Sequence, residues 1–367
     1  MKPANLLRVC FSDRTASKAR EELIAKNLVW EDLFRAAEDE LMIPALHARF
    51  QELGVLTEIP ADAKSFLAAV ENLNLERNQQ ILSELAVVAY LLNQVGIEPV
   101  LLKGSAYFLT GVYPSPAGRY LWDVDLLIPK LQLQTAVDVL SRNGFEQGSD
   151  DRLAEFRHHH PPLRRKGSIF FELHHSLGMG LCSSLLPASE VIEHSTEFDF
   201  QGTRVRLPSP THLMTHLIMH SQIQHPYNER IWPPLRAMRD LLLLRRRFDN
   251  EIDWSFIQHQ FRKVGRPGVL AMHLLQVRDT LGSETPFAIR LTGLTYLRWL
   301  RRKLLRALPP LRFLDPVYMY STVLVRRLRV LRNALGTPGG RRRIASEIFA
   351  PGVYRRIATD ILEGQGR

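Results

Sequence analysis

Two aspartates separated by one residue, Asp123 and Asp125, are the side chains of this sequence best arranged for chemistry. They stand at the start of an apolar run, Val124 to Ile128, which predicts a buried β-strand. Residues two apart on a strand point to the same face, so both carboxylates converge on one spot. Two like charges held side by side are costly unless a cation neutralises them, and carboxylate oxygens suit Mg²⁺.

A turn whose residues are suited to binding an anion precedes these acids. The short apolar run Val100 to Leu102 reads as a strand that ends at Lys103-Gly104-Ser105. Gly104 allows close approach of the backbone, and Ser105 as the cap of a short helix would leave backbone N–H groups free to bind phosphate. Lys103 and the later Arg119 add positive charge. We therefore expect a triphosphate to lie here.

A third acid is expected from a neighbouring strand. Ile169 to Leu173 is strongly strand-like and contains Glu172, whereas Phe171 would face the opposite side, into the core. Three carboxylates on adjacent strands beside such a turn suit two-metal phosphoryl transfer, with metals about 4 Å apart. The three carboxylates and the turn together indicate this chemistry more specifically than any one of them alone.

The segments LLKGSAYFLTGVYPSPAGRYLWDVDLLI and FFELHHSL resemble the polymerase-beta-type nucleotidyltransferase superfamily, in its bacterial branch labelled uncharacterised nucleotidyltransferase. The resemblance covers about Val95 to Leu177 and continues more weakly to about Leu244. It implies a small mixed sheet with helices on one side and two Mg²⁺ ions. It also implies transfer of a nucleoside monophosphate from a nucleoside triphosphate.

The predicted mechanism is an in-line attack by an acceptor hydroxyl on the α-phosphate. Asp123 and Asp125 hold both metals, and Glu172 completes the metal site of the attacking group and is a candidate for taking its proton. The predicted nucleotide-binding residues are Lys103, Gly104, Ser105 and Arg119. No motif in the sequence indicates the acceptor or the preferred base. The resemblance does not identify the substrate either, because superfamily members modify nucleic acids, antibiotics, sugars and proteins.

Histidines near these motifs offer several interpretations. In FRHHHPPLRRK, His158 and His160 would share a strand face; the segment suits an exposed basic strand, a phosphate or acceptor contact, or a metal site. His174 follows the third acid. His212, His216 and His220 recur every fourth residue, either packed in a helix or lining the nucleotide cleft. The candidate substrate contacts are His160, His174 and His216.

The remaining chain predicts an α+β fold, in which a small mixed nucleotidyltransferase sheet is flanked by helical regions at both ends. We expect a helical N-terminal region over 1–95, the nucleotidyltransferase core over 96–207, a helical domain over 208–297 and a basic, amphipathic helical tail over 298–367. The clearest N-terminal helix has an apolar stripe and ends near Gly96; the stripe is Ile81, Leu85, Val88, Leu92 and Val95. Ser209-Pro210 predicts the start of a later helix. Arg236 and Asp240, one turn apart, could pair on the surface, and the apolar run that follows Asp240 favours a structural over a catalytic role for it.

Composition favours a cytoplasmic protein with a large core. The chain has 367 residues, 45% of them hydrophobic, and two cysteines, too few for a disulfide framework. No run reaches about 18 apolar residues, as a spanning helix requires. From Arg298 to Arg367 sixteen Lys or Arg stand against four acids, a net charge of +12.

That basic tail suits an anionic membrane surface, a nucleic acid, or a helix packed on the protein with its arginines outward. Peripheral membrane association is therefore one expectation for its location. The alternative function is a non-catalytic nucleotide-binding or scaffold protein on the same fold, whose basic tail binds membrane or nucleic acid.

Overall fold

The computed structural model describes residues 2–25, 27–148, 158–224, 231–315 and 318. The chain divides into two compact units. The first comprises residues 1–228 and 232–291, and the second comprises residues 229–231 and 292–367. All of the chemistry predicted from the acids belongs to the first unit.

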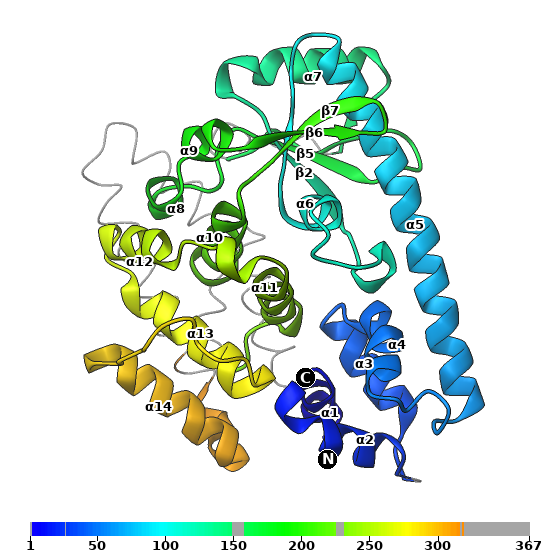
Figure 1. The fold of residues 1–367 in the computed structure, drawn as a ribbon, viewed down its shortest axis with the longest axis vertical. Coiled ribbons are helices and arrows are strands. Elements are labelled where there is room, and N and C mark those ends of the chain that lie inside the picture. The colour runs from blue at the N-terminus through cyan, green and yellow to red at the C-terminus, as the bar shows by residue number, and fades with distance from the viewer. Residues whose placement is uncertain (1, 26, 149–157, 225–230, 316–317, 319–367) are drawn as a thin grey trace. The chain divides into compact units, whose positions relative to one another are not determined.

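A seven-stranded mixed sheet is the centre of the first unit (Figure 1). Its order is β3-β4-β5-β2-β1-β7-β6. The strands are β1 (Val100–Leu101), β2 (Asp123–Leu127), β3 (Glu146–Gln147), β4 (Leu163–Arg164), β5 (Phe170–His174), β6 (Thr196–Phe200) and β7 (Thr203–Leu207). The mixed sheet and its flanking helices confirm the predicted α+β class.

Strands β2 and β5 run parallel and side by side, and their register decides where the acids lie. Asp125 pairs with Glu172, and Asp123 pairs with Phe170. Alternation sends Val124 and Phe171 to the other face, where both are fully buried. One face of the strand pair therefore fills the core while the other carries the charged side chains.

Helices account for most of the remaining described chain. The N-terminal ones are α1 (Pro3–Cys10), α2 (Ala16–Leu23), α3 (Trp30–Asp39), α4 (Ile43–Glu52) and α5 (Ala61–Asn93). Those interleaved with the strands are α6 (Lys103–Leu109), α7 (Leu133–Arg142), α8 (Leu181–Leu185) and α9 (Ala188–Glu193). The later ones are α10 (Pro210–Met219), α11 (Leu235–Phe248), α12 (Trp254–Lys263), α13 (Pro267–Leu281) and α14 (Gly293–Ala307).

Helix α5 is 33 residues long and joins the N-terminal helices to the sheet (Figure 1). The predicted stripe is buried at Ile81, Leu85, Val88 and Leu92, but Val95 lies beyond the helix and is 37% exposed. Gly96 follows with φ of 73°, a left-handed conformation that glycine adopts at little cost.

Two buried asparagines of α5 hold the loop that leads into β2. Asn78 Nδ2 donates to the carbonyl oxygens of Pro116 and Arg119, at 2.7 and 2.8 Å. Asn74 Nδ2 donates to Ala117 O at 2.7 Å. These bonds satisfy carbonyls of the 3₁₀ turn Pro116–Gly118. A helix in which the sequence indicated no chemistry thus fixes the backbone next to the acids.

Two local predictions are confirmed and one is wrong. Ser209 caps α10 by accepting a hydrogen bond from His212 N. Strand β1 ends close to the predicted turn. Ser105, in contrast, is not the cap of α6: the helix begins at Lys103 with Leu102 as its cap, and Ser105 Oγ donates back to Leu102 O at 3.0 Å.

The second unit contains α14 and the 3₁₀ segment Pro309–Leu314. Most of the basic tail predicted over 298–367 lies outside the described residues, and so do Phe156 and Arg157 of the basic segment before β4. Within the described part of the chain, no helix has the length and apolar character needed to cross a membrane.

Candidate active site

Asp125 and Glu172 form the centre of the site because they are opposite each other on β2 and β5. Together with His174 they each offer a ligand atom, and these atoms all lie within 4.8 Å of one another. Asp125 is 2% exposed, whereas 20% of the Glu172 side chain is exposed. The site therefore has a buried carboxylate at its floor and a more accessible one beside it.

His174 links the two acids. Its Nε2 lies 2.7 Å from Asp125 Oδ1 and 3.4 Å from Glu172 Oε2. Burial opposes protonation, but the hydrogen bonds to these carboxylates outweigh it and raise the pKa of His174. An imidazole that contacts both carboxylates holds them in place, and its protonated form offsets their repulsion.

Lys103 supplies a second positive charge to the floor of the site. Its Nζ lies 2.6 Å from Asp125 Oδ1, and its backbone has φ of 49°, which is unusual for a residue with a side chain. Burial alone would raise the pKa of Asp125, yet Lys103 and His174 hold it far below its ordinary value. Asp125 is therefore ionised at neutral pH.

Asp123 is partly exposed and stands two residues before Asp125 on the same strand. Burial and the charge of Asp125 raise the pKa of Asp123 to about 6. A carboxylate in this position gains from any further cation, because a cation relieves both its desolvation and its repulsion by Asp125.

Arg119 forms an ion pair with Asp240, a residue that the sequence suggested would lie on the surface. Its Nη2 donates to Asp240 Oδ2 at 3.0 Å and its Nε to Oδ1 at 3.1 Å. Tyr113 donates its hydroxyl to the same carboxylate. The predicted surface pairing of Arg236 with Asp240 is wrong, because Asp240 is 2% exposed and its carboxylate is bound by Arg119 and Tyr113.

The glycine of the Lys103-Gly104-Ser105 turn is explained by that arginine. A Cβ atom on Gly104 would lie 2.3 Å from Arg119 Nη1 and 2.3 Å from a methyl group of Leu121. No L side chain fits there without displacing both of them. The absent side chain therefore lets the Arg119 guanidinium pack directly against the turn.

The histidines are distributed differently from the sequence expectation. The rings of His158 and His159 lie 5.2 and 5.1 Å from the ring of His174. His160 instead places Nδ1 2.8 Å from Pro161 O. His216 is buried, and burial, followed by the charge of Lys103, lowers its pKa to about 3. The charge of Asp125 acts in the opposite direction and raises that pKa. His216 thus lies near the acids, without a hydrogen bond to them among the described contacts.

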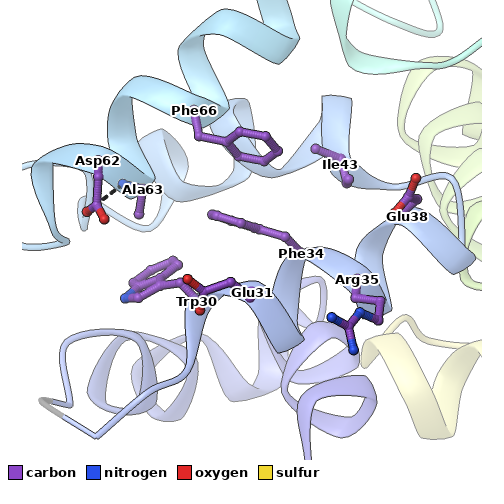
Figure 2. Close-up of a pocket in the computed structure, with 9 residues that line it drawn as sticks. All are labelled: Trp30, Glu31, Phe34, Arg35, Glu38, Ile43, Asp62, Ala63 and Phe66. Carbon is purple, nitrogen blue, oxygen red and sulfur yellow. Dashed lines mark hydrogen bonds between the residues drawn. The ribbon is translucent and has the colours of Figure 1, made fainter.

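A hollow of ≈ 430 Å³ lies elsewhere, among α3, α4 and the start of α5 (Figure 2). Its walls carry the aromatic rings of Trp30, Phe34 and Phe66, with Glu31, Glu38 and Asp62 around them. None of the residues predicted to act in catalysis lines it. The acids on β2 and β5 therefore remain the candidate active site.

Comparison with known proteins agrees with the geometry. The model of a family described as uncharacterised nucleotidyltransferase matches residues 26–282. The chain belongs to this nucleotidyltransferase family. No curated protein matches it. Among solved structures, an antigenic nucleotidyltransferase-like protein from Paracoccidioides brasiliensis is similar at 17% identity and a TM-score of 0.33, over 56% of this chain and 98% of that one.

The charged face of the β2–β5 strand pair fits a divalent cation. Carboxylate oxygens of Asp125 on β2 and Glu172 on β5 are adjacent, and Asp123 stands two residues before Asp125 on β2. Hard oxygen ligands of this kind are those that Mg²⁺ prefers. His174 Nε2 is already directed at the two carboxylates, which suits a residue that orients ligands.

The sequence alone did not identify the residues that surround the acids of this chain. Asp240 is the clearest case, and a signal was present: a charged residue stands between Met238, Leu241 and Leu244, which are all fully buried. An acid on the apolar face of a helix needs a buried partner. The approach of His159 to β5 had no such signal, because it depends on a bridge between His159 and His174.

Proposed function

We propose that this chain is a Mg²⁺-dependent nucleotidyltransferase that moves a nucleoside monophosphate from a nucleoside triphosphate to an acceptor hydroxyl. The observation that supports this most is the pairing of Asp125 with Glu172, with His174 between them. Family membership supports the reaction class.

Asp123, Asp125 and Glu172 are the residues that would hold the metal, as two ions. When bound, Mg²⁺ stabilises the negative charge that develops on the transferred phosphoryl group and promotes ionisation of the attacking hydroxyl. His174 would keep the carboxylates of Asp125 and Glu172 in one orientation throughout. Its contact distances of 2.7 and 3.4 Å support that role.

The reaction forms a bond between the acceptor oxygen and the α-phosphorus, and breaks the bond from that phosphorus to the bridging oxygen of the β-phosphate. Pyrophosphate leaves with the electron pair of the broken bond. The proton of the acceptor hydroxyl passes to Glu172, whose partly exposed side chain supports contact with an acceptor. His160 and His216 remain proposals as substrate contacts; the burial of His216 near Asp125 favours it over His160.

Lys103 and the backbone of Gly104 and Ser105 would bind the phosphates. Lys103 is close enough to Asp125 to be released toward phosphate once another cation neutralises that carboxylate. Arg119 is balanced by Asp240, so we propose that it shapes the turn at Gly104 and adds only part of its charge to nucleotide binding.

The experiment is the thermal stability of the purified protein with each of the four ribonucleoside triphosphates, with and without Mg²⁺. A ligand at about 100 times its dissociation constant stabilises the native state by roughly 2.7 kcal/mol. We expect a Mg²⁺-dependent rise in melting temperature that is absent from the Asp123→Asn/Asp125→Asn variant. An exposed acid, Asp32, provides the matched control Asp32→Asn, which should respond like the wild type.

The best nucleotide would then be supplied with a label on its α-phosphate to detect transfer to acceptors. A Mg²⁺-dependent shift that persists in the double variant would contradict the assignment of the metal ligands. The absence of a shift with any nucleotide would favour the scaffold function instead.

A further inference from the structure

Arg119 and Asp240 form an ion pair next to the Gly104 turn, and a second arginine, Arg236, lies one helical turn before Asp240. Asp240, on α11, accepts from Arg119 Nε and Tyr113 on Oδ1 and from Arg119 Nη2 on Oδ2. Arg236 is the second residue of the same helix, one turn before Asp240, and residues four apart on a helix are neighbours on one face. The side chain of Arg236 therefore leaves the helix next to the ion pair of Arg119 and Asp240.

The charge of Arg236 is not matched within the described chain. The carboxylate of Asp240 already accepts from two donor residues, and Arg236 makes no hydrogen bond or ion pair with any described residue. Its side chain is nevertheless only partly accessible to solvent. Burial and the nearby charge of Arg119 lower the pKa of Arg236, while Asp240, Tyr113 and Asp123 raise it. A partly desolvated guanidinium without a partner favours an anion.

The location of this surplus charge points to the outer end of a triphosphate. Arg119 lies directly against Gly104, and Asp123 is close enough to affect the titration of Arg236. The positive charge of Arg236 thus lies near Asp123 and near the Gly104 turn, where the phosphates are proposed to bind. A guanidinium can donate two parallel hydrogen bonds to one phosphate group, which a lysine cannot.

We propose that Arg236 binds the β- and γ-phosphates of the nucleotide, and that Asp240 holds Arg119 so that Arg236 is left free for this contact. This deepens the proposed function and rests on it for the identity of the natural ligand. The chemical requirement is more general, because any linear polyphosphate of about three phosphate groups presents the same oxygens.

The test uses inorganic tripolyphosphate as the probe and calorimetric titration of the full-length protein. We expect the wild type to bind it and Arg236→Gln to bind it about tenfold or more weakly, as the loss of a charge-assisted contact implies. Arg236→Lys should recover part of the affinity. The matched control is Arg247→Gln, since Arg247 is exposed near the other end of α11. Melting temperatures of all variants establish that they are folded.

A second comparison uses nucleoside mono- and triphosphates of the same base. Arg236→Gln should weaken the triphosphate at least tenfold more than the monophosphate. Equal losses for both nucleotides would overturn the inference. So would wild-type affinity for tripolyphosphate in Arg236→Gln, the same loss in Arg247→Gln, or no tripolyphosphate binding by the wild type.

The Asp125→Asn variant separates this inference from the proposed function. Binding of tripolyphosphate in the absence of Mg²⁺ depends on Arg236 and should persist in Asp125→Asn. Failure of the metal assignment would appear as Mg²⁺-dependent nucleotide binding that Asp125→Asn leaves intact, whatever Arg236→Gln does.

Discussion

The Nζ atom of Lys103 lies 2.6 Å from Oδ1 of Asp125, so the most buried acid of the site is neutralised by a residue of the chain itself. His174 reaches the same oxygen at 2.7 Å. The protein thus carries internal cations where the proposed function requires metal. Binding of Mg²⁺ must compete with Lys103 for the Asp125 carboxylate.

Replacing Lys103 by methionine should therefore have two effects of opposite sign. The free energy of unfolding should fall by about 2 to 4 kcal/mol, because a buried carboxylate loses a partner. Mg²⁺ should stabilise Lys103→Met more than it stabilises the wild type, since the metal meets no competing ammonium group. Urea unfolding with and without Mg²⁺ measures both effects. An equal response to Mg²⁺ in the two proteins would contradict the competition.

The buried pair of Arg119 and Asp240 predicts a large loss of stability in Asp240→Asn. Side-chain exposure is 10% for Arg119 and 3% for Asp240, so the variant leaves a buried guanidinium without its counter-charge. We expect a loss of about 3 to 5 kcal/mol in urea unfolding. Asp249→Asn, at the C-cap of the same helix, is the control; Asp249 is 59% exposed, so its pair with Arg245 should contribute less than about 1 kcal/mol.

The same pair predicts a pH dependence. Burial alone would raise the pKa of Asp240, but Arg119 and Tyr113 lower it below the ordinary value of 3.8. A lowered native pKa stabilises the protein above the unfolded value and loses that contribution as pH falls through the native one. The stability difference between wild type and Asp240→Asn should thus be constant from about pH 5 to 7 and shrink below about pH 4. A difference that grows toward acid pH would contradict this.

Gly104→Ala should destabilise the protein through packing and not through backbone strain. Its Cβ would lie 2.3 Å from Arg119 Nη1, and Arg119 cannot move without leaving Asp240. Forced overpacking of this kind costs about 1 to 3 kcal/mol. Gly118→Ala is the matched control, because its nearest neighbour would be 3.6 Å away in Tyr113. Melting temperatures that fall equally in both variants would refute the packing argument.

His174 and His160 should behave differently although the sequence suggested both. His174→Ala removes the group that orients Asp125 and Glu172, so Mg²⁺-dependent nucleotide affinity should fall about 10- to 100-fold. His160→Ala removes a ring whose described contact is to Pro161 O, and affinity should stay near that of the wild type. Calorimetric titration distinguishes them. Equal losses would place His160 at the site.

The positions of the three acids followed from local pattern. The alternation of Asp123 with Val124, and of Glu172 with Phe171, fixes which side chains share a face before any tertiary contact is known. The apolar stripe of α5 and the cap at Ser209 are local in the same sense. Neighbouring residues determine these features, so a sequence is sufficient to predict them.

The residues around the acids could not be predicted, because their contacts join segments that are distant in the sequence. Arg119 meets Asp240 across 121 positions, and Asn78 reaches the backbone of Arg119 across 41. The role of Ser105 was wrong for a different reason. The helix begins at Lys103, whose positive φ lets the chain turn two residues earlier than the serine suggested.

The most direct test of the central claim is calorimetric titration of the preferred nucleoside triphosphate into wild type and Asp125→Asn over a series of Mg²⁺ concentrations. The account predicts wild-type affinity that rises with Mg²⁺, and binding to the variant that does not rise with Mg²⁺ and is about 100-fold weaker than wild-type binding at saturating Mg²⁺. Nucleotide affinity that is independent of Mg²⁺, or is unchanged by Asp125→Asn, would contradict a metal site built on Asp125 and Glu172.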